Sequence, residues 1–173
     1  LEHQLFNSDL CHQLFADDLK LYTFIKNDTS VDSLQSALNR LEQWCITWHL
    51  SVNVSKCQVL HLDKNNLCHQ YTFAGSFIPS AKVVKDLGVI VDELLTFDPH
   101  INNVVSRASS RVGVLFKGFS SRSPVLLVKA FVTYVRPILE YASNVWNPHL
   151  LKHINAIENV QRRFTTRVPS ISS

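Results

Sequence analysis

The stretch HQLFADDLKLYTFI, residues 12–25, decides the fold of the first part of this 173-residue chain. Two short β-prone runs flank the polar pair Asp17–Asp18. Along Leu19–Ile25, leucine, threonine and isoleucine at odd positions alternate with lysine, tyrosine and phenylalanine at even positions. Such alternation is typical of a strand whose two faces differ, and two strands around a tight polar turn form a hairpin. The sequence therefore predicts a β-hairpin with two carboxylates at its tip. An isolated Asp-Asp pair is also a common turn former or solvated cap.

The segment after the hairpin predicts one helix and several short strands. Apolar residues recur at three- and four-residue steps from Val31 to Trp48, which indicates an amphipathic helix with Thr29 or Ser30 as its N-cap. Three further segments have alternating runs that predict strands. They are HLSVNVSKCQVLHL, whose two runs lie around Asn53 to Lys56, QYTFAGSFIP, which has a Gly-Ser turn, and KVVKDLGVIVD. Residues 1–97 should therefore form an α+β layer in which a helix packs on a sheet.

From Asp98 onward the pattern is helical. Periodicity predicts helices over residues 99–116, 124–146 and 150–167, and Pro137 should kink or break the second of them. The predicted fold class is α+β: antiparallel strands and a helix over residues 1–97, then an all-helical bundle over residues 98–173.

Charge divides the chain in the same place. Residues 1–97 hold seven Lys and Arg against eleven Asp and Glu, a net of −4, whereas residues 98–173 hold ten against three, a net of +7. A basic half attracts a phosphate backbone, although charge alone is weak evidence for one partner.

The rest of the composition narrows the class of protein. No run of about 18 apolar residues and no signal peptide is visible, so the sequence predicts a soluble intracellular protein with no membrane partner. The four cysteines form no C-x-x-C pair and are expected to be reduced thiols, and the spacing of Cys57, His61, Cys68 and His69 fits no common zinc site. The chain starts at Leu1 and has no methionine, which indicates a fragment or a degraded copy.

Five segments resemble one family in collinear order. LFADDLKLY resembles the F/Y-A-D-D signature of reverse transcriptases, and its surroundings resemble the non-LTR retrotransposon (LINE-type, jockey-like) enzymes. After EQWCITWHL, the segment SVNVSKCQVLHL is similar to their N-x-x-K turn and VKDLGVIVDELLTFDPHI to their K-x-L-G-V segment. ILEYASNVWNP and IENVQRRFTTR are similar to phrases of their thumb. A chance match of five ordered segments is far less common than a match of one.

The resemblance implies an RNA-directed DNA polymerase, a nucleotidyltransferase that extends a DNA primer on an RNA template with dNTPs. Residues 1–97 would be the C-terminal part of the palm and residues 98–173 the thumb. Mg²⁺ would be the cofactor of the complete enzyme, in a two-metal site. The complete element protein would act in the nucleus.

The resemblance also implies roles for residues. Asp17 and Asp18 would be the metal-binding catalytic pair, with the second contributing less directly, and Phe15 and Ala16 would shape the turn beside the primer end. Lys56 would be a general acid for the departing pyrophosphate, although a solvated turn lysine explains it equally well. Leu87 and Gly88 would lie at the primer grip, or form a simple strand bend.

Arginines in the basic half are the candidate contacts with the nucleic-acid backbone. Arg107 and Arg111 lie four residues apart on one predicted helix, and Arg163 and Arg167 repeat that spacing on another. For each of them a solvated surface position is the competing interpretation. Helical spacing places the three tryptophans in the core rather than in a base-stacking site; they are Trp44, Trp48 and Trp146.

One part of a polymerase site is not visible. Two metals about 4 Å apart need a further carboxylate from a separate strand, and only Glu2 and Asp9 precede the turn. The fingers and the upstream palm segments also have no counterpart, so the isolated chain is expected to be inactive. Two alternatives stay open: a decayed element remnant that at most binds nucleic acid, and an unrelated helical interaction protein.

Overall fold

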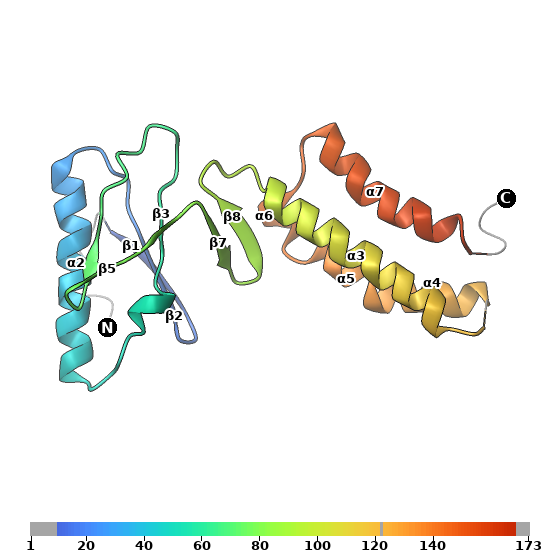
Figure 1. Ribbon diagram of the computed structural model, residues 1–173, viewed down its shortest axis with the longest axis horizontal. Helices are drawn as coiled ribbons and strands as arrows, with labels where there is room; N and C mark the ends of the chain where they lie inside the picture. Colours follow the sequence, from blue (N-terminus) through green and yellow to red (C-terminus); the bar gives the residue numbers. More distant parts are fainter. Residues whose placement is uncertain (1–9, 122, 169–173) are drawn as a thin grey trace. The chain divides into compact units, whose positions relative to one another are not determined.

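The computed structural model describes residues 10–121 and 123–168. It divides the chain into two compact units, Leu1–Val84 and Lys85–Ser173. Small two-stranded sheets and one long helix make up the first unit, and most of the second is helical (Figure 1). The predicted mixed α+β class is confirmed at this level. Residues 1–9, which include Glu2 and Asp9, lie outside the described part.

The predicted hairpin is confirmed. Strands β1 (Cys11–Phe15) and β2 (Asp18–Tyr22) pair antiparallel, from Cys11 opposite Tyr22 to Phe15 opposite Asp18. The two residues between them form the loop, and Ala16 has φ 53°. A positive φ within a two-residue loop is typical of the primed turns, which match the twist of a hairpin.

Helix α2 (Asp28–Thr47) begins one residue after Asn27, so the predicted N-cap at Thr29 or Ser30 is wrong. The Asn27 Oδ1 accepts the backbone N–H of Ser30 at 3.1 Å and its hydroxyl at 3.0 Å. Asparagine is as good an N-cap as serine, and here it satisfies a backbone donor of the first turn. The Ser30 hydroxyl therefore supports the cap instead of forming it.

The core of the first unit lies between α2 and the hairpin of strands β4 (Thr72–Phe73) and β5 (Ser76–Phe77). Its buried members are Tyr71, Phe73 and Ile78, which contact apolar residues of α2 such as Leu34 and Leu38. Polar bonds fix the same contact: the Gln35 side chain donates to the Thr72 carbonyl at 2.9 Å and accepts the Thr72 N–H at 3.0 Å. A side-chain amide thus bonds with the edge of a strand much as another strand would.

The other strands of the first unit are shorter than predicted. A 3₁₀ turn, η1 (Val54–Lys56), interrupts the first alternating segment, which leaves β3 (Val59–Leu60) to pair in parallel with β6 (Ser80–Ala81). Strands β4 (Thr72–Phe73) and β5 (Ser76–Phe77) form a hairpin. Its turn is Ala74–Gly75, not Gly-Ser, and both turn residues have positive φ as a type I′ turn requires.

The second unit combines one hairpin with a helical bundle. Strand β7 (Val83–Asp86) begins at the boundary between the units and pairs with β8 (Val89–Asp92). The helices that follow are α3 (Asp98–Gly118), α4 (Pro124–Tyr134), α5 (Arg136–Glu140), α6 (Ser143–Trp146) and α7 (Leu151–Thr165). The predicted helix over residues 124–146 is broken into α4, α5 and α6. Pro137 lies in the first turn of α5, so the expected effect of this proline is confirmed.

Helix α3 is the centre of this bundle, with α7 on one side and α4 and α5 on the other (Figure 1). A larger core joins α3, α4 and α7, in which the Phe131 and Phe164 rings stack at 4.3 Å. A second core joins Val89 of β8 to Ile101 and Trp146. Trp146 is therefore a core residue as predicted. The same expectation is wrong for Trp48, which is 64% exposed because it follows the last turn of α2.

Candidate functional site

The acidic pair lies at the exposed tip of the β1–β2 hairpin. Asp17 is the second loop residue and Asp18 is the first residue of β2, opposite Phe15. Both carboxylates are exposed, and the Phe15 side chain is 64% exposed. Alternation along the strands places Phe15, Asp18 and Lys20 on one face of the hairpin. The tip therefore offers carboxylates beside an open aromatic ring.

Ala16 holds this tip in a conformation that alanine rarely adopts. Its φ of 53° lies in the left-handed region, which costs a residue with a Cβ about 1–2 kcal/mol relative to glycine. Non-glycine residues in this region cluster at functional turns, where the surrounding structure holds them. The hairpin pairing on both sides of Ala16 supplies that restraint.

Asp17 and Asp18 fit Mg²⁺ in kind but not in number. Carboxylate oxygens are the ligands that this hard cation prefers, and Mg²⁺ requires six oxygen ligands in near-octahedral geometry. Within the described ranges, 10–121 and 123–168, no three His, Cys, Asp or Glu side chains gather as a metal site would need. The two aspartates can thus supply only part of a magnesium site.

Lys56 is the last residue of η1 and is exposed. Asn53 orders this turn, since its side chain accepts the Ser55 N–H at 3.1 Å and the Ser55 hydroxyl at 2.6 Å. The N-x-x-K segment is therefore an asparagine-capped turn that ends in lysine. In the part of the chain that the structure describes, no hydrogen bond or ion pair joins Lys56 to Asp17 or Asp18.

Leu87 and Gly88 form the type I′ turn of the β7–β8 hairpin, with φ of 45° and 91°. The Tyr141 hydroxyl donates a hydrogen bond to the Leu87 carbonyl at 2.7 Å. A Cβ on Gly88 would lie 3.3 Å from Cε1 of Tyr141. The glycine therefore serves both the turn and the approach of an aromatic ring. The sequence does not predict the role of Tyr141, because a contact between residues 54 positions apart produces no local sequence pattern.

Gly88→Ala should destabilise the second unit by about 2–3 kcal/mol, because a left-handed alanine and a crowded Tyr141 ring add their costs. Gly75→Ala is the matched control: its φ is 71°, but its Cβ would meet open space, so we expect only about 1 kcal/mol. Urea unfolding of the two variants measures the difference. Equal losses would show that the Tyr141 contact does not matter.

Two carboxylates that the sequence analysis did not single out organise the second unit. Asp92 is 8% exposed and accepts the N–H groups of Leu94, Thr96 and Phe97 and the Thr96 hydroxyl. Burial raises the pKa of Asp92, but these four hydrogen bonds outweigh burial and leave the pKa below its usual value. Asp92 thus orders the loop that delivers the chain into α3.

Asp98, in the first turn of α3, links this helix to α7. Its carboxylate lies 2.7 Å from Nζ of Lys152 and 2.6 Å from Nε2 of His153. The hydrogen bond from Lys152 comes first among the causes that lower the pKa of Asp98. A carboxylate at a helix N-terminus is also favoured by the helix dipole. The contact fixes the start of α7 against the start of α3.

His100 is a buried titratable group behind the β7–β8 hairpin. It is 3% exposed, its Nδ1 accepts the Ile90 N–H at 3.1 Å, and its ring lies 5.1 Å from that of Trp146. An accepting Nδ1 requires a neutral ring with its proton on Nε2. Burial, with a smaller effect of Arg107, lowers the pKa of His100. The ring therefore joins β8 to α3 only while it is neutral.

His100 should make stability fall with acidity. Because the folded-state pKa is below the unfolded value of about 6.5, folding favours the neutral ring, and its contribution is complete above pH 6.5 and lost as pH falls toward the folded value. His100→Phe should unfold more easily at pH 7.5 but lose less stability between pH 7 and pH 5. Urea unfolding across this range tests the difference, and parallel curves would contradict it.

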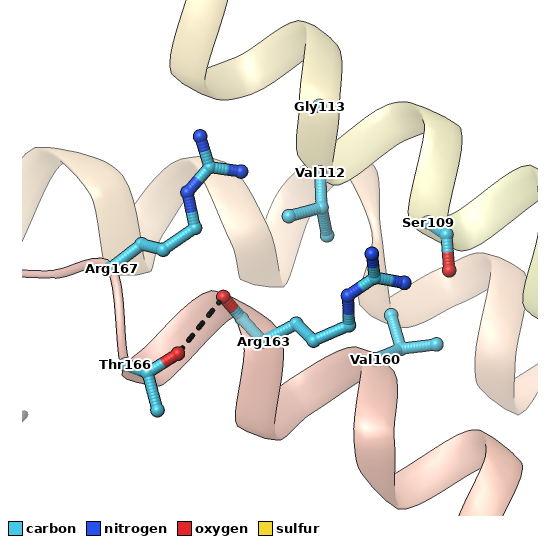
Figure 2. A pocket seen from close by; sticks show the side chains of 7 residues that line it. All are labelled: Ser109, Val112, Gly113, Val160, Arg163, Thr166 and Arg167. Carbon is cyan, nitrogen blue, oxygen red and sulfur yellow. Dashed lines mark hydrogen bonds between the residues drawn. The ribbon is translucent and has the colours of Figure 1, made fainter.

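The two arginine pairs lie on different sides of α3. Arg163 and Arg167 line a surface pocket of about 340 Å³, together with residues of α3 that include Ser109 and Gly113 (Figure 2). Arg107 and Arg111 are exposed on α3 itself. At about 100° per residue they lie roughly 160° around the helix from Ser109 and Gly113. The structure thus brings Arg163 and Arg167 together and separates them from the other pair.

Comparison with known proteins finds polymerases of mobile elements among the relatives of this chain. The chain is 29% identical over 161 residues to the RNA-directed DNA polymerase from mobile element jockey of Drosophila funebris, covering 89% of this chain and 17% of that protein. The Drosophila melanogaster jockey polymerase is 26% identical over 92% of this chain and 18% of the relative. The probable RNA-directed DNA polymerase from transposon X-element of Drosophila melanogaster is 27% identical over 86% of this chain and 17% of the relative.

These matches establish distant homology to the RNA-directed DNA polymerases of mobile elements. It extends over most of this chain, which spans less than a fifth of the length of the relatives it matches. No family model and no solved structure matches the chain. Among the described helices, none is long and apolar enough to cross a membrane.

Proposed function

We propose that this chain is the palm end and thumb of the RNA-directed DNA polymerase of a non-LTR retrotransposon. Within a longer protein it would extend a DNA primer on an RNA template with dNTPs. The observation that carries the proposal is the collinear similarity over 161 residues to the jockey polymerase. The exposed Asp17–Asp18 turn is the feature of the chain that suits this chemistry.

In this proposal each predicted residue has one task. Asp17 and Asp18 hold Mg²⁺ together with carboxylates from the rest of the polymerase, and the bound metal supplies charge stabilisation at the reacting phosphate. Phe15 and Ala16 shape the turn beside the primer end. Lys56 donates a proton to the departing pyrophosphate, and the rigid Asn53 turn keeps it in place. Leu87 and Gly88 contact the primer, with Tyr141 as their support.

The basic second unit is the part of the chain that binds nucleic acid. Residues 98–173 have a net charge of +7, and those of their arginines that the structure describes are exposed at the surface. Arg163 and Arg167 on one side of α3, and Arg107 and Arg111 on the other, bind backbone phosphates of the primer–template. This function would remain in an element remnant that no longer copies RNA.

The isolated 173-residue chain should not incorporate dNTPs on a primed RNA template. A two-metal site needs carboxylates from more than one strand, and the described residues gather only two of the required ligands at the hairpin tip. A primer-extension assay with Mg²⁺ tests this expectation. Incorporation that Asp17→Ala abolishes would show that the chain is a complete polymerase.

Binding to an RNA–DNA primer–template should survive in the isolated chain. Two phosphate contacts would weaken binding about tenfold between 50 and 200 mM salt, because each contact releases counterions. A filter-binding series over these salt concentrations measures the slope. Absence of binding at low salt would favour a protein-interaction module over a nucleic-acid-binding one.

A further inference from the structure

The pocket between α3 and α7 combines two cations with two hydroxyls over an apolar floor. Arg163 and Arg167 extend from the end of α7 toward α3, Ser109 and Thr166 add the hydroxyl groups, and Val112 and Val160 lie beneath (Figure 2). Among the described residues, none that lines this pocket is acidic. Its chemistry therefore favours an anion that also has a carbon face.

Core packing orients the Arg167 guanidinium. Its central carbon lies 4.3 Å from the centre of the Phe116 ring, and Phe116 in turn packs against Phe164 with ring centres 5.7 Å apart. The distance between Arg167 and Phe116 is within the range of a cation–π contact, which uses the aromatic ring and leaves the guanidinium N–H donors available. An arginine that is already held in this way loses less freedom when it binds an oxyanion.

The last turn of α7 does not repel an anion as an open helix end would. Unsatisfied carbonyls give a helix C-terminus a partial negative charge. Here the Arg162 carbonyl accepts the Thr166 N–H and hydroxyl, each at 3.0 Å, and the Phe164 carbonyl accepts the Arg167 N–H at 3.1 Å. The Thr166 hydroxyl also lies 3.4 Å from the Arg163 carbonyl, the bond drawn in Figure 2.

In the part of the chain that the structure describes, no ion pair joins either guanidinium group to a carboxylate. Ion pairs among the described residues of the second unit join Arg136 to Glu140, and Lys152 and His153 to Asp98. Neither Arg163 nor Arg167 takes part in these pairs. Two uncompensated cations that face one hollow bind an external anion more strongly than scattered surface arginines do.

We propose that this pocket binds one phosphate group of a nucleic-acid backbone, with the adjoining sugar against Val112 and Val160. Arg163 and Arg167 donate to the phosphate oxygens, and the Ser109 hydroxyl supplies a further donor. The inference rests on the proposed nucleic-acid-binding function and sharpens it. It gives Arg163 and Arg167 a shared, shaped site, whereas Arg107 and Arg111 make only distributed contacts.

Gly113 permits a test that leaves the charge unchanged. It lines the pocket, and a Cβ added to it meets nothing within 4 Å, so Gly113→Gln places a side chain toward the pocket without strain. Gly118→Gln is the matched control, since it lies at the end of the same helix, equally open, and does not line the pocket. Both changes favour the helix, so neither should impair folding.

Binding of a labelled RNA–DNA duplex to the 173-residue chain is measured for the wild type and these variants. We expect Gly113→Gln and the double variant Arg163→Gln/Arg167→Gln to weaken binding about tenfold at low salt, the loss of one charge-assisted phosphate contact. Gly118→Gln should leave affinity within about twofold. The double variant should also lower the salt slope by about 1, as for one lost phosphate.

The possible results of these experiments test the pocket proposal and the proposed nucleic-acid binding separately. If the wild type binds duplex with a steep salt dependence and Gly113→Gln binds as Gly118→Gln does, the pocket proposal is overturned while the proposed function stands. If the wild type binds no duplex, both fail. Inorganic phosphate is the second probe, and its effect on heat stability is measured at constant ionic strength. Suppose that phosphate stabilises the wild type, that Gly113→Gln removes this stabilisation, and that the wild type binds no duplex. This result would overturn the nucleic-acid backbone as the source of the phosphate and indicate a free phosphate ligand.

Discussion

Asp92→Ala is expected to destabilise the second unit by about 3–5 kcal/mol, because it removes four hydrogen bonds to one buried carboxylate. A single hydrogen bond to a charged acceptor contributes about 1.5–3 kcal/mol, and four that share one acceptor group contribute less than their sum. The loop after Asp92 depends on that carboxylate. Leu95 and Phe97 both have left-handed φ, and Phe97, which precedes α3, provides no side-chain cap. Without Asp92 the loop loses the hydrogen bonds that hold this strained backbone, so the start of α3 loosens.

Guanidinium unfolding measures the loss of stability caused by Asp92→Ala. Trp146 fluorescence in a Trp44→Phe/Trp48→Phe background reports the unfolding of the second unit. Glu93→Ala is the matched control, because it removes the adjacent negative charge and should cost less than about 0.5 kcal/mol. Asp92→Asn should fall between the two, since the amide keeps one acceptor oxygen. Equal stability of the Asp92→Ala and Glu93→Ala variants would refute the structural role of Asp92.

The pH dependence of this effect has a definite sign. The pKa of Asp92 is lowered in the folded protein, so the folded state favours the charged carboxylate. Its contribution is complete above the unfolded value of about 3.9 and is lost as pH falls through the lower folded value. The stability difference between the wild type and the Asp92→Ala variant should therefore be constant near neutral pH and shrink below about pH 4. A difference that grows on acidification would contradict it.

The local sequence pattern was sufficient to predict those elements whose conformation depends on their own residues. The Asp17–Asp18 hairpin follows from two alternating runs around a polar turn, and the break at Pro137 follows from the missing backbone donor. The strand lengths around Asn53 did not follow. Asn53 bonds its own following residues and forms the η1 turn, so local side-chain chemistry there overrides an alternating pattern.

Tertiary contacts set the remaining features of the candidate site. Tyr141 meets Leu87 across 54 residues, and His153 meets Asp98 across 55, so neither pairing has a sequence-local signal. Helical spacing predicted Arg163 and Arg167 on one helix face, but α7 ends at Thr165 and Arg167 lies in the turn after it. The packing of α7 on α3, which the sequence pattern does not show, brings both side chains to one pocket. A cue for Asp92 did exist: an aspartate before Thr96 and Pro99, at the entry to a helix, is a common loop-ordering position.

The second large effect concerns Asp17 inside a complete polymerase. A chimera in which this chain replaces the matched 161-residue segment of the Drosophila funebris jockey polymerase restores the rest of the protein. In it, Asp17→Ala should lower the rate of dNTP incorporation at least about a thousandfold, because a metal ligand supports several kcal/mol of transition-state stabilisation and each 1.4 kcal/mol is a factor of ten. The Asp17 side chain is exposed, so its removal leaves no cavity in a core.

Asp32→Ala is the control for this substitution, since it removes an exposed aspartate from the surface of α2 and should leave the rate within about twofold. Asp18→Ala should lie between the two variants, because the proposal gives Asp18 the less direct part. Duplex affinity should be equal in all of them, as the basic pocket lies in the other unit. If Asp17→Ala lowers dNTP incorporation and leaves duplex affinity unchanged, Asp17 acts in the chemical step. Equal incorporation rates for Asp17→Ala and Asp32→Ala would show that the acidic turn is a hairpin loop with no catalytic role.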